Sequence, residues 1–110
     1  MPANLPERDE IVNRFPDIRN WAEQRNIIVG GSMQAQFVKL IEEVGELAEG
    51  IAKNRPEAIV DGIGDAVVVL TILAAQAGVT IEDCIETAWN EIKDRKGRMV
   101  MGTFVKESDL

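Results

Sequence analysis

Acidic side chains recur at helical spacing in one segment of the sequence, and they are the residues best suited to chemistry. Glu42, Glu43, Glu46 and Glu49 share a segment whose apolar residues also recur every three or four positions. At about 100° per residue on a helix, Glu42, Glu46 and Glu49 form one stripe, and Glu43 stands one turn before Glu46. A solvated helix face, on which such runs are common, is one explanation.

Two further carboxylates, Asp61 and Asp65, lie four residues apart in the next segment. On a helix, their side continues into an apolar wall of Val68, Val69 and Ile72. A carboxylate beside such a wall loses hydration, which costs several kcal/mol unless a cation or hydrogen-bond donors compensate. Two antiparallel helices would bring this pair close to the turn that carries Glu42, Glu43 and Glu46. We therefore expect five carboxylates to share one groove and to need a metal ion.

The ligand chemistry of such a groove favours Mg²⁺ or Mn²⁺ over zinc, because every ligand is an oxygen. The chain contains no histidine and no tyrosine, so carboxylates must carry any acid–base or metal chemistry. A multi-carboxylate metal site with open positions also recruits phosphate oxygens. The chemistry implied is hydrolysis of a phosphoanhydride, with one carboxylate orienting or deprotonating the attacking water.

Composition limits the partners and the compartment. A chain of 110 residues with 45% hydrophobic residues fits one domain, residues 1–110. The net charge of −7 argues against a duplex nucleic-acid partner. Cys84 is the single cysteine, so we expect no intrachain disulfide and a cytoplasmic location. We also expect no membrane span, because no stretch reaches the roughly 18 apolar residues that crossing a bilayer requires.

The elements that position the acids are predicted to be helices. Apolar periodicity predicts helices over residues 17–25, 33–53, 57–77 and 81–95. Ser32 and Thr80 are predicted N-caps, and Pro56 suits the first turn of the third of these helices. A further turn or two over 8–15 would be interrupted by Pro16.

The remaining segments are predicted to lack regular structure. Residues 26–31 form a connector, and the tail over 98–110 is expected to be an irregular extended segment or loop.

The segment 57–77 is apolar on every side over most of its length, which is typical of a helix that is buried all round. So short a chain cannot enclose such a helix alone. We therefore expect an all-α antiparallel bundle of about four helices, completed by homodimerisation or by a dimer of dimers. The last helix is expected to bury its apolar face, composed of Ile81, Ile85, Ala88, Trp89 and Ile92.

The segment Glu42-Glu43-Val44-Gly45-Glu46 resembles the Glu-Glu-x-x-Glu half of the signature of MazG-like nucleotide pyrophosphohydrolases, in the all-alpha NTP pyrophosphatase superfamily. The second half of that signature, Glu-x-x-Asp, is altered. Asp65 holds the Asp position, Gly62 replaces the expected Glu, and Asp61 lies one residue further back. The resemblance covers residues 17–97, and its two ends are similar to a compact branch that phages and mobile elements often encode.

The resemblance implies roles for individual residues. Glu43, Glu46 and Asp65 would be the main magnesium ligands, Asp61 would supply the missing ligand, and Glu42 would be a ligand or the water-orienting base. From the last helix Asn90 and Lys93, with Lys96 nearby, would reach the nucleotide phosphates, and Trp21 would lie near the base. Each of these residues also has a purely structural explanation. Trp21 would be a core residue, Asn90 would be a solvated surface residue, and the lysines would be cations that stabilise the C-terminus of a helix.

The function implied is Mg²⁺-dependent conversion of a (d)NTP and water to a (d)NMP and pyrophosphate, as house-cleaning of the nucleotide pool. Two alternatives stay open. One is a dimeric nucleotide-binding or regulatory module of the same fold with little or no catalysis, and the other is a phosphoribosyl-ATP pyrophosphohydrolase. The sequence does not name the base or the sugar.

Overall fold

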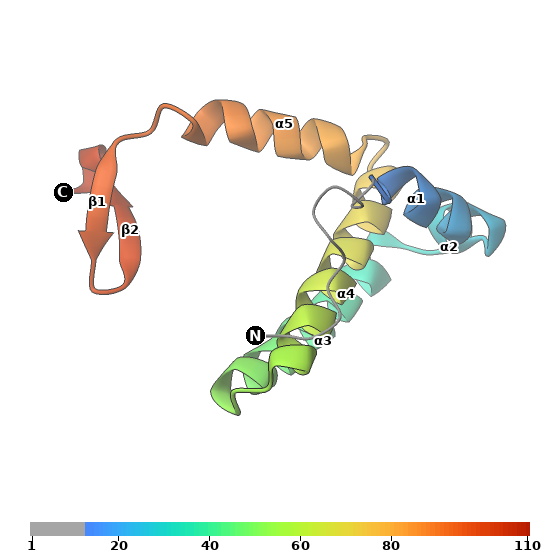
Figure 1. The fold of residues 1–110 in the computed structure, drawn as a ribbon. Helices are drawn as coiled ribbons and strands as arrows, with labels where there is room; N and C mark the ends of the chain where they lie inside the picture. The colour runs from blue at the N-terminus through green and yellow to red at the C-terminus, as the bar shows by residue number, and fades with distance from the viewer. Residues whose placement is uncertain (1–12) are drawn as a thin grey trace.

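The computed structural model describes residues 13–110, which form a series of helices followed by a β-hairpin (Figure 1). The predicted all-α architecture is confirmed, and one small sheet is the only sheet within residues 13–110. The elements in chain order are α1 (Phe15–Gln24), α2 (Ile27–Gly30), α3 (Met33–Ala52), α4 (Pro56–Gln76), α5 (Ile81–Ile92), β1 (Gly97–Val100), β2 (Thr103–Lys106) and the short 3₁₀ helix η2 (Glu107–Asp109).

The residues predicted to cap α3 and to begin α4 lie at the ends of these helices as expected. The Ser32 hydroxyl accepts a hydrogen bond from the Ala35 amide at 3.1 Å, so Ser32 caps α3. Three residues connect α3 to α4, and Asn54 among them adopts a left-handed conformation with φ of 53°. Pro56 then lies in the first turn of α4, where its missing N–H costs no hydrogen bond.

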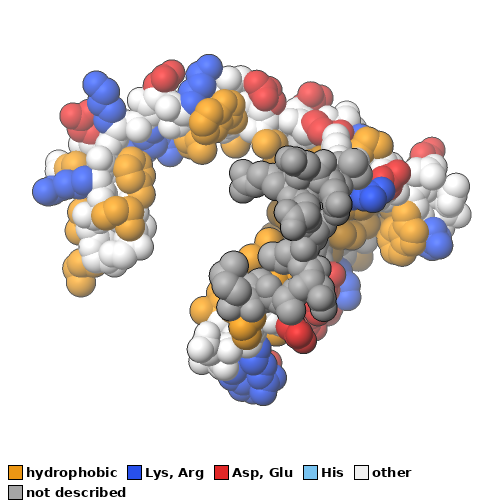
Figure 2. Space-filling model, in the orientation of Figure 1, with side chains coloured by type: hydrophobic (Ala, Val, Ile, Leu, Met, Phe, Trp, Pro, Cys, Tyr) orange, Lys and Arg blue, Asp and Glu red, His pale blue; other side chains and the backbone are white. Residues whose placement is uncertain are grey.

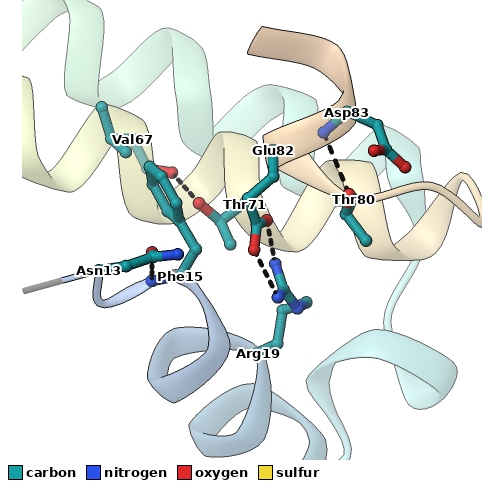
Figure 3. Close-up of polar contacts among 8 residues, drawn as sticks. All are labelled: Asn13, Phe15, Arg19, Val67, Thr71, Thr80, Glu82 and Asp83. Carbon is teal, nitrogen blue, oxygen red and sulfur yellow. Dashed lines mark hydrogen bonds and ion pairs between the residues drawn. The ribbon is translucent and has the colours of Figure 1, made fainter. Parts of the chain in front are cut away.

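An antiparallel pair of long helices, α3 and α4, forms the body of the molecule (Figure 1). The helix α1 packs across the C-terminal half of α4, and Ala22 is fully buried there. Thr71 of α4 is also fully buried, and its hydroxyl donates to the Val67 carbonyl at 2.7 Å (Figure 3). The small core is completed by Val69, Ile72 and Ala74.

The helix over 57–77 is expected to need a second copy to cover it, and in the single chain it is covered only in part. Val60, Ile63 and Leu70 are exposed, because α3 and α1 cover only part of the surface of α4. By length and composition alone, α4 is apolar enough to cross a bilayer, because an 18-residue window within it has a mean hydropathy of 2.0. The central helix of a bundle passes the same test, so this finding does not indicate a membrane span.

The helix α5 leaves the end of α4 and points away from the α3/α4 pair (Figure 1). Gly78, with φ of 81°, ends α4, and the Thr80 hydroxyl caps α5 by accepting from the Asp83 amide at 3.1 Å (Figure 3). The helix ends at Ile92, three residues before its predicted end. Its expected core face is wrong for the single chain, because no described element covers Ile85, Trp89 or Ile92.

The C-terminal tail is a regular hairpin, so the expectation of an irregular tail is wrong. β1 and β2 pair antiparallel from Gly97 opposite Lys106 to Val100 opposite Thr103. Met101 and Gly102 form the two-residue turn with φ of 51° and 84°, the pair of positive angles that tight hairpins favour.

The predictions for residues 8–31 are tested only in part, because the structure describes the chain from residue 13 onward. Residues 8–12 of the helical segment predicted over 8–15 lie outside the described residues, and α1 begins at Phe15. Pro16 lies in the first turn of that helix, so it starts α1 and does not interrupt it. The predicted connector over 26–31 contains the single turn α2.

Candidate active site

The acidic turn of α3 presents its carboxylates on two sides of the helix. Glu43 faces inward and is only 6% exposed, whereas Glu42 and Glu46 are exposed to solvent. Lys39, one turn earlier, lies with its Nζ 3.4 Å from Glu43 Oε1 and 3.8 Å from Glu42 Oε2. The solvated-face explanation therefore fails for Glu43, which is the most deeply buried carboxylate described.

The second oxygen of Glu43 has no partner. Its Oε2 atom is buried and accepts no hydrogen bond in the described part of the chain. A buried carboxylate oxygen without a compensating group is costly, and it is satisfied by a cation or by donors brought to it. Glu42 and Glu46 lie within one turn of Glu43, and carboxylate oxygens are the type of ligand that a hard divalent cation such as Mg²⁺ prefers.

The register of α3 against α4 sets which acids lie at the same level. A Cβ built on Gly62 would lie 2.9 Å from Leu47 Cβ, and one on Gly50 would lie 3.1 Å from Ala58 Cβ. These two close approaches show that the helices are antiparallel, because the residue numbers on α4 increase as those on α3 decrease. One turn beyond Leu47 toward the start of α3 is Glu43, and the matching turn of α4 carries Asp65.

The two aspartates of α4 nevertheless face another side of that helix. Asp61 and Asp65 are exposed and line a groove of about 780 Å³ between α1 and α4. Its other lining residues are Asn13, Arg14, Phe15, Ile18, Val60, Gly64, Val67 and Val68. Among residues 13–110, no group of three or more acidic or thiol side chains is arranged to hold a metal ion. The expectation of five carboxylates in one groove is therefore wrong for a single chain.

Gly62 accounts for the altered second half of the motif. Its Cα faces the side chain and backbone of Leu47, with all three nearest atoms within 3.2 Å of an added Cβ. A glutamate cannot occupy this position unless α3 and α4 move apart. Asp61 is the neighbouring acid that does reach the surface.

The residues expected to bind the nucleotide lie on two separate parts of the chain. Asn90 is exposed in the last turn of α5, and Lys93 and Lys96 are exposed just beyond the end of that helix. The helix α5 makes no extended contact with α3 within the described residues. Trp21 is 45% exposed and is therefore not a core residue. The guanidinium of Arg25 lies 4.7 Å from the centre of its ring.

Sequence reasoning missed the ion pair that fixes the start of α5. Arg19 of α1 donates through Nη1 and Nη2 to the two carboxylate oxygens of Glu82, at 2.5 and 2.8 Å (Figure 3). The hydrogen bonds from Arg19 lower the pKa of Glu82 below its usual range. The two residues are 63 positions apart, and nothing in their local sequence pairs them. Lys39 was also missed, although its spacing from Glu43 is the standard one for a helical ion pair.

The antiparallel helical pair with its acidic turn places the chain in the class of all-α domains, and the comparisons with known proteins name the family. The MazG nucleotide pyrophosphohydrolase domain matches residues 32–100. The chain therefore belongs to the MazG nucleotide pyrophosphohydrolase family.

One curated relative comes from a phage. The uncharacterized 18.2 kDa protein in the rep-hol intergenic region of Haemophilus phage HP1 (strain HP1c1) is 53% identical over 60 residues. The matched region is 54% of this chain and 37% of the relative, so the chain spans little more than a third of that protein. No solved structure matches the chain.

Proposed function

We propose that this chain is a Mg²⁺-dependent nucleoside triphosphate pyrophosphohydrolase. Water would add across the bond between the α- and β-phosphates of a (d)NTP, which gives a (d)NMP and pyrophosphate. The observation that carries the proposal is the buried, unpartnered oxygen of Glu43 in an acidic turn of a MazG-family domain. A house-cleaning role in the cytoplasmic nucleotide pool follows from this activity.

Each acidic residue has a distinct task in this proposal. Glu43, Glu46 and Asp65 would hold Mg²⁺, with Asp61 in place of the Glu that Gly62 excludes. Glu42, exposed beside Glu43, would complete the ligand set or orient the attacking water. The metal, when bound, neutralises charge on the phosphates and polarises the bond that breaks. Asn90, Lys93 and Lys96 would bind the phosphates, and Trp21 would contact the base.

A homodimer is part of the proposal. The single chain leaves Asp61 and Asp65 in an open groove and leaves the apolar face of α5 uncovered, so a second copy is needed to enclose the nucleotide. Neither nucleic acid nor membrane is required for any step.

A panel assay tests the proposed activity. Purified protein is incubated with each NTP and dNTP and Mg²⁺, and the release of pyrophosphate and monophosphate is measured. We expect release from at least one nucleotide and none when EDTA removes the metal. Absence of release from every nucleotide, with the metal present and the helical signal intact, would overturn the proposal.

The Gly62 position supports a second candidate, a nucleotide-binding or regulatory module without turnover. In that case one metal ligand of the family is missing and nothing replaces it. Calorimetry would then detect nucleotide binding with Mg²⁺ while the panel shows no pyrophosphate. Phosphoribosyl-ATP belongs in the same panel, because release from it alone would identify the third candidate activity.

A further inference from the structure

A lysine side chain lies beside the acidic turn of α3, the turn that carries Glu42, Glu43 and Glu46. The Nζ atom of Lys39 is 3.4 Å from Oε1 of Glu43 and 3.8 Å from Oε2 of Glu42, so one ammonium group bridges two carboxylates. Among the ion pairs of residues 13–110, only these two involve the acidic turn. In Figure 2, acidic side chains on the α3/α4 pair lie next to basic ones. Lys39 is therefore the cation that the described chain itself supplies to these acids.

The stability of the helix does not explain a lysine at position 39. On a helix, an ion pair four residues apart is more stabilising when the acid precedes the base, because each charge then lies toward the end of the helix dipole that favours it. Lys39 precedes Glu43 and lies in the first half of α3, which begins at Met33. Lys53 follows Glu49 at the other end of the helix and has the favourable order. The interaction of Lys39 is thus with the acids that it bridges more than with the helix.

Lys39 compensates only one oxygen of the buried carboxylate. The side chain of Glu43 is 8% exposed, and its Oε1 atom is the one that lies near the ammonium. Its Oε2 atom is buried and has no hydrogen-bond partner within the described residues. The cost of removing that second oxygen from water is therefore not offset by Lys39. A cation that reaches both oxygens would satisfy Glu43 better than the lysine does.

Lys39 and a divalent ion compete for the same oxygens. Mg²⁺ binds carboxylate oxygens at about 2.0–2.1 Å and holds its ligands in a nearly ideal octahedron. An ion on the oxygens of Glu42 and Glu43 would therefore lie close to the ammonium, and like charges at such a separation repel. The side chain of Lys39 is 55% exposed, so the ammonium can move into water without disturbing the core.

We propose that Lys39 is a built-in counter-ion of the metal site. It neutralises Glu42 and Glu43 in the protein without bound Mg²⁺, and Mg²⁺ displaces it from their oxygens on binding. Lys39 thereby reduces the repulsion among the three acids of the turn and sets the concentration of Mg²⁺ that the site needs. The inference rests on the metal site of the proposed function and adds to it a residue that tunes the affinity for the metal.

Lys39→Met tests the displacement, because it removes the charge and keeps most of the length of the side chain. We expect this variant to bind Mg²⁺ about 2- to 5-fold more tightly than the wild type, the range that an exposed ion pair is worth. Calorimetry without nucleotide measures the Mg²⁺ affinity, and electron resonance of Mn²⁺ measures metal binding independently. Thermal melts should show a lower midpoint for the variant without Mg²⁺ and a larger rise when Mg²⁺ is added. Weaker or unchanged metal binding by Lys39→Met would overturn the proposal.

Two further variants separate displacement from other effects of the substitution. Lys39→Arg keeps the positive charge and should bind Mg²⁺ no more tightly than the wild type. Lys53→Met is the matched control, because it removes the same charge from the pair with Glu49 on the same helix. We expect Lys53→Met to bind Mg²⁺ as the wild type does. An equal gain in affinity for Lys39→Met and Lys53→Met would reveal a general effect of net charge and would contradict a specific role for Lys39.

Metal binding and turnover together distinguish this proposal from the hydrolase proposal. A gain in Mg²⁺ affinity for Lys39→Met, with no pyrophosphate released by the wild type, would contradict the hydrolase and support the counter-ion. Pyrophosphate release by the wild type, with equal Mg²⁺ affinity in the two proteins, would do the reverse. A folded wild-type protein that binds neither Mg²⁺ nor Mn²⁺ would contradict both proposals.

Discussion

Gly62 of α4 lies directly against Leu47 of α3, and a Cβ at position 62 would come within 2.9 Å of Leu47 Cβ. The missing glutamate of the motif is therefore a packing requirement of this chain. The close approach holds α3 and α4 in the register that places the Glu43 and Asp65 turns at the same level. In the proposed site Asp61, exposed one residue earlier, would be the substitute ligand.

Gly62→Ala should lower the free energy of unfolding by about 1–3 kcal/mol, because the added methyl group meets Leu47 and the backbone of α3. Gly64→Ala is the matched control on the same helix, since a Cβ there meets nothing within 4 Å. The control should gain roughly 0.5–1 kcal/mol from the better helix former. Urea unfolding at fixed protein concentration measures both changes. Equal effects of the two substitutions would contradict the close contact.

Glu43→Gln and Glu46→Gln should each reduce pyrophosphate release by at least about 100-fold, equivalent to roughly 2.7 kcal/mol of barrier. Both substitutions keep the side-chain size and remove the charge that holds the metal. Glu49→Gln is the control, because Glu49 lies on the same helix and pairs with Lys53. That variant should retain wild-type turnover, and a comparable loss at all three positions would argue against a specific metal site.

Mg²⁺ should raise the thermal midpoint of the wild-type protein and leave that of Glu43→Gln nearly unchanged. The ion binds the folded state only, so its stabilisation grows with its concentration above the dissociation constant. In the wild type the ion would also offset the free-energy cost of burying one oxygen of Glu43 without a hydrogen-bond partner. Thermal melts with increasing Mg²⁺ measure the shift. An equal rise in both proteins would place the ion elsewhere.

The Arg19–Glu82 pair should make stability depend on pH. The pKa of Glu82 is lowered in the folded chain by hydrogen bonds from Arg19. A lowered pKa gives a contribution that is present above the ordinary value of 4.5 and is lost as the pH falls toward the folded-state pKa. The difference in urea midpoint between wild type and Glu82→Gln should therefore be largest near neutral pH and shrink below pH 4.5. Glu86→Gln, which removes a carboxylate of the same helix outside the pair with Arg19, is the control.

Trp89→Glu should dissociate the proposed dimer, because it places a charge in the centre of the apolar face of α5. The control is Val29→Glu, which introduces the same charge at a residue that is 90% exposed on α2. Sedimentation or light scattering measures the mass of each variant. We expect a monomer for Trp89→Glu and a dimer for Val29→Glu. A dimer in both cases would show that a different surface joins the copies.

The sequence predicts the helices well because their signals are local. Apolar spacing, the hydroxyl of Ser32 and the ring of Pro56 act within one or two turns, and each places a helix end within a few residues of the observed one. The cap at Thr80 is equally local. These local signals therefore place the bounds of α3 and α4 and the start of α5.

The arrangement of the carboxylates could not be predicted in the same way, because it depends on contacts between helices. The close contact between Gly62 and Leu47 decides which side of α4 faces α3. From the sequence alone, Gly62 is recognisable only as a departure from the motif. The apolar face of α5 shows the same limit, since its periodicity indicates burial without naming the covering chain. The pairing of Arg19 with Glu82 has no local signal at all.

Cys84 is exposed in the first turn of α5 and is the single cysteine of the chain. A thiol-reactive spin label therefore attaches once per copy, on the helix whose apolar face is uncovered in the single chain. Pulsed electron resonance on the labelled protein then measures the distance between the label on Cys84 of one copy and the label on Cys84 of the other. In the proposed dimer, this one distance measures how far apart the first turns of the two α5 helices lie.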